Sequence, residues 1–298
     1  MTARFGSLLT AMVTPFDRQG CLDVDGAVTL ARHLVAHGND GLVLAGTTGE
    51  SPVLTDSEKT ELWRTVTEAV TVPIIAGSGT YDTAHSIELT KTAEACGVAG
   101  ILAVCPYYNR PSQAGIEAHF RAIAGATSLP VMLYDIPVRT GRRVSGETLL
   151  RLVTDVDNIV SVKDAGNDVV AAARLIATAS DGFELYSGDD VLTLPLLSVG
   201  AVGAVSVAAH WVGPQIAEMI AAFRAGDVER ARRINADILD AVAFQTSDET
   251  PNPVPAKAML RALGLPAGEC RLPHVEPPGS GLQAQARKII DELGLASA

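Results

Sequence analysis

Short apolar runs alternate along the chain with longer amphipathic stretches. Eight such runs, each followed by polar or glycine-rich residues, predict β-strands at 8–14, 41–45, 72–76, 100–105, 130–134, 159–162, 184–186 and 203–207. The starts of consecutive runs lie 19 to 33 positions apart. This repeat is typical of βα units that follow one another and close into an eight-stranded parallel barrel.

The stretches between the runs carry apolar residues at three-to-four spacing, which predicts outer helices at 25–37, 56–70, 83–96, 113–126, 146–153, 168–179 and 211–225. Beyond residue 225 the strand pattern stops, and helices are predicted at 226–244, 253–263 and 281–293. We therefore expect an α/β fold, a (β/α)8 TIM barrel at 1–225 that carries the chemistry, followed by a C-terminal helical region at 226–298. An open doubly wound sheet is less favoured, because no nucleotide-binding glycine loop is present.

Composition narrows the possible partners. The chain has 298 residues, 47% hydrophobic and 19% charged, which is enough apolar material for one large core. Its net charge of −11 argues against nucleic acid or an anionic membrane as the main partner. The first long apolar run is too short to cross a bilayer, and neither a secretory signal nor a C-x-x-C pair is evident. We expect a cytoplasmic protein that acts on small molecules.

Reactive groups in such a barrel lie at the C-terminal ends of the strands. Of the five lysines, only Lys163 ends an apolar strand, where burial favours the neutral amine that attacks a carbonyl to form an imine. Tyr134 ends the neighbouring strand, roughly 4.8 Å away, and its phenol could pass protons to a group bound at Lys163. Taken singly, Lys163 also fits a salt bridge to Asp164, and Tyr134 also fits a core aromatic.

Other residues could bind anions. Thr47 and Thr48 stand between two glycines, where hydroxyls and amides can converge on a carboxylate, although an ordinary turn has the same composition. Arg139 offers a planar fork for a second carboxylate, or is a solvated loop residue. The sequence lacks a zinc-protease helix, a P-loop, a dinucleotide fingerprint and a G-x-S-x-G motif. We expect no metal and no organic cofactor.

Six segments in a fixed order carry a resemblance: GTTGES at 46–51, PYYN at 106–109, YDIPVRT at 134–140, the strand-end Lys163, SGDD at 187–190 and NPVPAK at 252–257. They resemble the pyruvate-dependent class I aldolases, the family of the dihydrodipicolinate synthases, the N-acetylneuraminate lyases and the 2-keto-3-deoxy sugar acid aldolases. The resemblance covers nearly the whole chain, and Arg139 favours the synthase branch. Two positions depart from the family pattern: Asp135, where Asn is commoner, and Asp164, where Glu is commoner.

The resemblance implies a role for each matching residue. Lys163 would form an imine with pyruvate, and Tyr134, Thr47 and Tyr108 would relay protons, with Tyr108 reaching in from a neighbouring subunit. Thr48 would hold the pyruvate carboxylate, Arg139 would bind the carboxylate of aspartate 4-semialdehyde, and Gly188 and Val205 would line the site with their backbones. The implied enzyme is a homotetramer, a dimer of dimers, and makes 4-hydroxy-tetrahydrodipicolinate for lysine and diaminopimelate biosynthesis.

Two alternatives stay open at this point. An aldolase for keto-deoxy sugar acids or N-acetylneuraminate would use the same imine, and a binding protein could be built on an inactive barrel. The resemblance also implies that feedback inhibition by lysine is weak or absent. At the positions that bind lysine in feedback-sensitive relatives, this chain has Asp56 and Lys59 for two histidines, Tyr81 for an asparagine and His85 for a glutamate.

Overall fold

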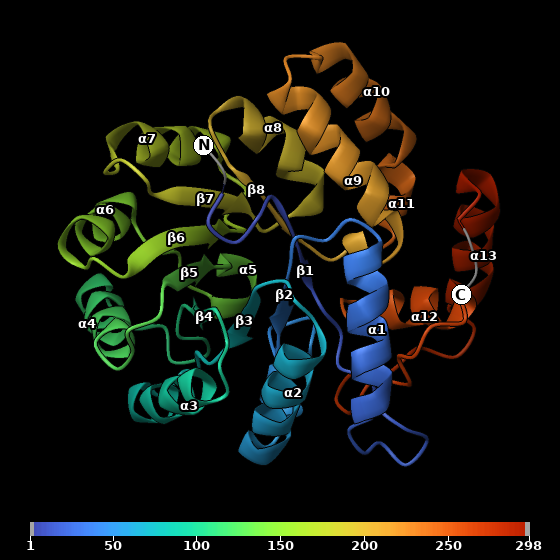
Figure 1. Ribbon diagram of the computed structural model, residues 1–298, viewed down its shortest axis with the longest axis horizontal. Helices are drawn as coiled ribbons and strands as arrows, with labels where there is room; N and C mark the ends of the chain where they lie inside the picture. Colours follow the sequence, from blue (N-terminus) through green and yellow to red (C-terminus); the bar gives the residue numbers. More distant parts are fainter. Residues whose placement is uncertain (1–2, 296–298) are drawn as a thin grey trace.

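The computed structural model describes residues 3–295. Eight parallel strands close into a barrel in sequence order (Figure 1). They are β1 (Leu8–Ala11), β2 (Gly41–Leu44), β3 (Ile74–Gly77), β4 (Gly100–Val104), β5 (Val131–Asp135), β6 (Ile159–Asp164), β7 (Glu184–Ser187) and β8 (Gly203–Ser206). The predicted α/β barrel is therefore confirmed.

Helices cover the outside of the barrel. They are α1 (Val24–Ala36), α2 (Asp56–Ala69), α3 (Thr83–Ala95), α4 (Gln113–Ala124), α6 (Gly146–Asp155), α7 (Val169–Thr178), α8 (Thr193–Ser198) and α9 (Ala209–Arg224). Six of them begin at a residue whose side chain accepts a hydrogen bond from the first turn, namely Asp23, Thr55, Asp82, Ser112, Ser145 and Asp168. Such caps stabilise helix starts, which explains why the predicted starts are close to the observed ones.

Two helices have no counterpart among the predicted ones. They are α8 and the single turn α5 (Pro137–Thr140), and two short 3-10 turns, η1 (Ser51–Val53) and η2 (Asp190–Leu192), also follow strand ends. These segments are too short to show a helical period. Three of them, η1, α5 and η2, lie on the side of the barrel where the strands end.

The inside of the barrel is filled by every second strand residue. These inward side chains form one apolar cluster that includes Leu9, Val43, Ile75, Leu102, Met132, Tyr134, Tyr186 and Val205. Tyr134 pairs in register with Lys163, and Lys163 pairs in register with Tyr186. Because register partners in a sheet point to the same face, Lys163 also points into the barrel.

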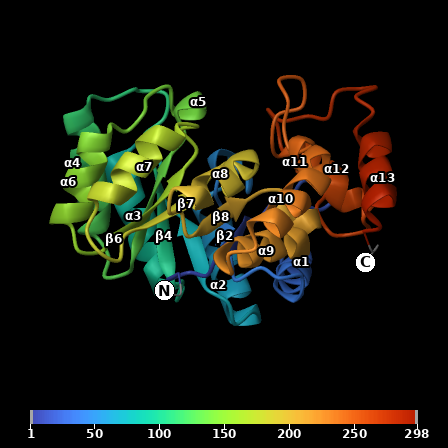
Figure 2. The ribbon, with the colours of Figure 1, turned by 90° about the horizontal axis from the view of Figure 1, so that it is seen from above.

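The chain beyond α9 forms α10 (Val228–Asp237), α11 (Leu239–Ala243), α12 (Val254–Ala262) and α13 (Leu282–Leu293). Figure 2 shows these helices gathered on one side of the barrel. Apolar residues of α10, α11 and α12 belong to the same core cluster as the outer helices of the barrel. The domain boundary at residue 225 remains a prediction. Within residues 3–295, no helix has the length and apolar character needed to span a membrane.

Candidate active site

A cavity of about 290 Å³ lies at the C-terminal ends of the strands. Its lining includes Thr47 after β2, Tyr107 after β4, Tyr134 at the end of β5 and Arg139 in α5. Pro273 and His274 of the C-terminal region also border it. Reactive side chains that are far apart in sequence therefore surround one space large enough for small carbonyl compounds.

Lys163 lies beside Tyr134 with its amine unpaired. Its Nζ is 4.3 Å from the centre of the Tyr134 ring, and the residue is 4% exposed. No carboxylate within 4.0 Å and no hydrogen-bond partner meets this Nζ among residues 3–295, and the Asp164 carboxylate instead accepts the amide of Gly166 at 2.7 Å. Burial lowers the pKa of Lys163 to about 8, although the charge of Asp190 opposes the change. A substantial fraction of this amine is therefore neutral and nucleophilic near pH 8.

Tyr134 remains a proton donor at neutral pH. Burial raises its pKa to about 12, while the Thr47 hydroxyl and then the Arg139 guanidinium act in the opposite direction. The phenol thus carries its proton and lies next to the amine and to a second hydroxyl. This arrangement suits the transfer of protons to and from an adduct on Lys163.

The loop 46–51 is held in a compact turn. The amides of Glu50 and Ser51 donate to the carbonyls of Thr47 and Gly46, each at 3.1 Å. The hydroxyl of Thr14 donates to the carbonyl of Gly49 at 2.7 Å. Thr47 borders the cavity, whereas Thr48 is 2% exposed and its hydroxyl accepts a hydrogen bond from Asn252 Nδ2 at 2.9 Å.

The remaining predicted site residues lie in different surroundings. Gly188 is tightly enclosed, because a Cβ there would lie 3.0 Å from Lys163 Cγ and from the Asp164 carbonyl oxygen, closer than most Cβ contacts. Val205 is buried inside the barrel. Tyr108, in contrast, is 91% exposed with a φ of 71°, and it does not line the cavity of its own chain.

The structure adds residues that the sequence did not single out. Asp190 of the SGDD segment is buried, and one of its carboxylate oxygens accepts the amides of Val207 and Ala208 at 2.9 and 3.0 Å. Its charge favours the ammonium form of Lys163. Tyr107 rather than Tyr108 lines the cavity, and it packs edge-on against Tyr81 with ring centres 5.4 Å apart. The only signal for Asp190 in the sequence was its place in a polar segment after a strand.

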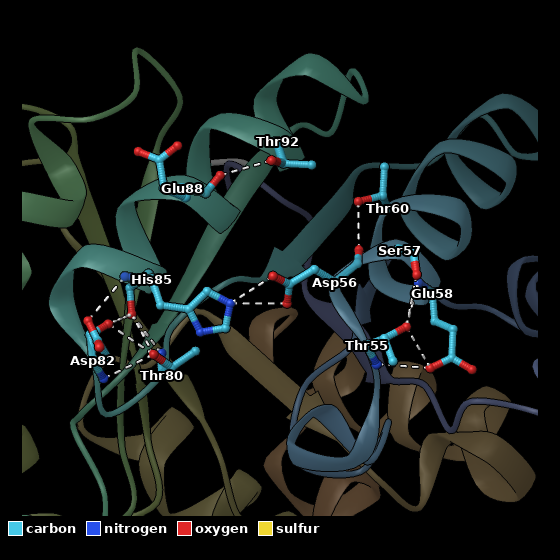
Figure 3. Close-up of polar contacts among 11 residues, drawn as sticks. Thr55, Asp56, Ser57, Glu58, Thr60, Thr80, Asp82, His85, Glu88 and Thr92 are labelled. Carbon is cyan, nitrogen blue, oxygen red and sulfur yellow. Dashed lines mark hydrogen bonds and ion pairs between the residues drawn. The ribbon is translucent and has the colours of Figure 1, made fainter.

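Two of the residues at the predicted effector positions, His85 and Asp56, contact each other. Figure 3 shows the imidazole of His85, near the start of α3, pointing at the carboxylate of Asp56, the first residue of α2. His85 Nε2 lies 3.0 and 2.9 Å from the two carboxylate oxygens. Burial lowers the pKa of the neighbouring Lys59, which is 4% exposed. Asp56 thus already has a partner within the chain.

No group of three or more His, Cys, Asp or Glu side chains within residues 3–295 is arranged to hold a metal ion. The reactive groups that line the cavity are phenols, hydroxyls and a guanidinium, and the Lys163 amine lies 4.3 Å from the ring centre of one of these phenols, Tyr134. A buried lysine with a lowered pKa beside a proton donor, at the C-terminal end of a parallel barrel, is the arrangement that defines the class of Schiff-base aldolases.

Comparison with known proteins gives the family within that class. The chain belongs to the dihydrodipicolinate synthetase family, whose model matches residues 4–292. It is 52% identical over 274 residues to 4-hydroxy-tetrahydrodipicolinate synthase of Moorella thermoacetica, which covers 91% of this chain and 93% of that protein. It is 51% identical over 273 residues to 4-hydroxy-tetrahydrodipicolinate synthase 2 of Streptomyces coelicolor, covering 91% and 90% of the two proteins.

Solved structures agree with this assignment. Dihydrodipicolinate synthase from Bacillus anthracis superposes with a TM-score of 0.92 at 43% identity, covering 97% of this chain and 99% of that one. The enzyme from Cyanidioschyzon merolae with lysine bound gives a TM-score of 0.94 at 46% identity, covering 98% and 99%. The family inferred from the six motifs is therefore confirmed.

Proposed function

We propose that this chain is a 4-hydroxy-tetrahydrodipicolinate synthase that condenses pyruvate with L-aspartate 4-semialdehyde. The observation that carries the proposal is the buried amine of Lys163, which has no ion-pair or hydrogen-bond partner among residues 3–295. It lies 4.3 Å from the ring centre of Tyr134, and Tyr134 lines the cavity together with Thr47 and Arg139. Relatives at about half identity over nine tenths of the chain bear this name. The reaction supplies a precursor of lysine and diaminopimelate.

The first half of the reaction forms the nucleophile. The neutral amine of Lys163 attacks the keto carbon of pyruvate, and the resulting carbinolamine loses water to give a protonated imine. Loss of a proton from the pyruvate methyl group then gives an enamine. We assign the proton transfers to the Tyr134 phenol with the hydroxyl of Thr47, and the binding of the pyruvate carboxylate to Thr48 and the amides near it. The backbones of Gly188 and Val205 would line the site.

The second half joins the two substrates. The enamine carbon attacks the aldehyde of aspartate semialdehyde, which forms the carbon–carbon bond and a hydroxyl. The amino group of the second substrate then attacks the imine carbon, closes the ring and releases the Lys163 amine. One water molecule leaves overall, and no oxidant, metal or organic cofactor is required.

Arg139 favours aspartate semialdehyde over a sugar acid aldehyde as the second substrate. Its guanidinium borders the cavity close to Tyr134, and its Nη2 donates to the carbonyl of Asn252 at 3.1 Å. That contact leaves other N–H groups of the fork for a substrate carboxylate.

The exposed Tyr108 supports a dimeric site. A tyrosine that is 91% exposed, on a loop with a positive φ, is placed to contact another subunit. We propose that Tyr108 completes the proton relay of a neighbouring subunit within a homotetramer of two dimers, and that the enzyme acts in the cytoplasm.

Trapping with borohydride tests the proposal. Reduction of the protein in the presence of pyruvate should attach the substrate to the peptide that contains Lys163, and Lys163→Ala should abolish the adduct. Steady-state assays should show turnover with aspartate semialdehyde and much less with keto-deoxy sugar acids. An adduct on another lysine, or a preference for sugar acids, would overturn the assignment.

A further inference from the structure

A buried ion pair joins the loop 46–51 to the C-terminal helical region. Glu50 Oε1 lies 2.7 Å from Nζ of Lys257 in α12, and neither side chain is exposed to solvent. Neither residue has a part in the chemistry proposed above. Because a buried ion pair is costly to desolvate, its presence beside the cavity calls for an explanation.

The C-terminal region supplies the groups that meet the Glu50 carboxylate in the described chain. The second oxygen, Oε2, accepts the amide of Arg271 at 2.8 Å. The Lys257 amine also donates to the carbonyl of Glu269 at 3.0 Å and lies 4.1 Å from the centre of the Phe16 ring. The Glu50 carboxylate favours the ammonium form of Lys257 against the effect of burial, and the contacts together fix the position of the Glu50 side chain.

The contacts of the side chain also bear on the backbone of Glu50. Its φ is 57°, in the left-handed region that residues with a side chain adopt uncommonly, so a fixed side chain helps to maintain this conformation. The same residue closes the turn, because its amide donates to the carbonyl of Thr47 at 3.1 Å and its carbonyl accepts the amide of Val53 at 3.0 Å. Fixing Glu50 therefore fixes the turn that presents Thr47 and Thr48.

Asn252, in the connector before α12, forms a second link between the C-terminal region and the residues around the cavity. Its Nδ2 donates to the hydroxyl of Thr48 at 2.9 Å, and its carbonyl accepts Nη2 of Arg139 at 3.1 Å. Since the Thr48 hydroxyl accepts this bond, its own proton remains available for a substrate carboxylate. The C-terminal region thus touches the two groups assigned to the two substrate carboxylates.

We propose that Lys257, acting through Glu50, is a positioning residue for the pyruvate-binding loop. The inference rests on the proposed function and extends it, because it makes the C-terminal helical region a part of the pyruvate site. Lys257 touches no substrate. It holds the turn in the conformation in which Thr48 binds the pyruvate carboxylate and Thr47 takes part in proton transfer.

Three variants separate positioning from simple stability. Lys257→Met leaves a buried carboxylate without its cation, and Glu50→Gln combined with Lys257→Met removes both charges. Arg261→Met is the matched control: Arg261 lies in the same helix and pairs with Glu276 at 2.6 Å, but in residues 3–295 no polar contact joins it to the loop 46–51. Each variant is assayed for the pyruvate concentration that gives half-maximal borohydride trapping, for the KM and kcat of turnover, and for its melting temperature.

We expect Lys257→Met to raise half-saturating pyruvate roughly tenfold or more, since small displacements of binding groups cost that much. The KM for pyruvate should rise by a larger factor than the one by which kcat falls. Arg261→Met should leave half-saturating pyruvate, KM and kcat unchanged. The double variant should regain the wild-type melting temperature, because no buried charge is left unpaired, while half-saturating pyruvate stays raised.

The proposal is wrong if Lys257→Met and Arg261→Met change half-saturating pyruvate alike. It is also wrong if the double variant regains wild-type pyruvate binding together with its stability. Absence of any pyruvate adduct on the wild-type enzyme would be a different result, because it would refute the proposed function itself.

Discussion

Replacing Asp135 by Asn should make the stability of the protein less dependent on pH. Asp135 is the last residue of β5, is 2% exposed and points away from the barrel interior, opposite to Tyr134. Its Oδ1 accepts the amide of Val144 at 3.1 Å, and its Oδ2 lies 3.6 Å from Nε of Arg143. Burial raises the pKa of Asp135 from 3.8 to about 7, and the nearby Asp164 carboxylate acts in the same direction. The hydrogen bond from Val144 and the Arg143 guanidinium compensate only in part.

The sign follows from the two pKa values. Below about pH 4 the carboxyl is protonated in both the folded and the unfolded chain, so its burial does not lower the stability through ionisation. Between that pH and the folded pKa of about 7, the unfolded chain releases its proton and the folded chain keeps it, so stability falls as pH rises. Above about pH 7 both states are ionised and the full cost remains.

The difference between the folded and unfolded pKa values sets an upper limit to the change in unfolding free energy. At roughly 1.4 kcal/mol for each pH unit, that difference corresponds to at most about 4 kcal/mol. About half of the span lies above pH 5.5. The unfolding free energy of Asp135→Asn minus that of the wild type should therefore increase by up to about 2 kcal/mol as the pH rises from about 5.5 to about 8.5.

Urea unfolding at several pH values measures this gap. The Asn side chain still accepts the Val144 amide and carries no charge, so the comparison isolates the ionisation. Asp168→Asn is the control, since Asp168 is an exposed carboxylate 3.2 Å from the same Arg143. The pKa of Asp168 is lowered, and the largest cause is the hydrogen bond that it accepts from the Ala171 amide. The change in unfolding free energy caused by Asp168→Asn should be the same at all of these pH values. If the gap for Asp135→Asn is as constant as that of the control, Asp135 titrates normally and the reasoning fails.

Three further outcomes follow from the site. Arg139→Ala should still trap pyruvate but lose most turnover, and an equal loss of both would show that Arg139 supports the pyruvate site instead. Mixed under verified subunit exchange, the inactive variants Tyr108→Phe and Lys163→Ala should regain some activity. If no activity returns, Tyr108 acts within its own chain or has no role in the reaction. Lysine at sub-millimolar concentration should inhibit the initial rate weakly, because Asp56 is already bonded to His85. Strong inhibition would contradict this.

The eight strands could be predicted because both of their faces are covered. Such strands are continuous apolar runs, and the chain returns to one after each helix. The strand ends were less certain, as the first run shows. Residues 12 and 13 stay buried after β1 ends at Ala11, and the amide of Val13 donates to the imidazole of His210 at 3.1 Å instead of continuing the ladder. Apolar composition alone does not distinguish a buried loop from a strand.

The site was predictable where it depends on strand ends. Lys163 and Tyr134 are last or nearly last in adjacent strands, so the barrel brings them together without any information about loops. The position of Tyr107 in the cavity and the burial of Asp190 depend on loop conformations. Nothing in the spacing of residues specifies those conformations.

Burial by itself does not separate a reactive lysine from a structural one. Burial lowers the pKa of both Lys163 and Lys257, and both amines lie about 4 Å from an aromatic ring. Their partners differ, because Lys257 is held by the carboxylate of Glu50 at 2.7 Å and by a carbonyl, whereas Lys163 has neither kind of partner within the described residues 3–295. A bound carboxylate favours the ammonium form, which has no lone pair for attack on a carbonyl. Pyruvate should therefore react at Lys163 and leave Lys257 unmodified, and only the folded chain, by bringing Glu50 to Lys257, creates that difference.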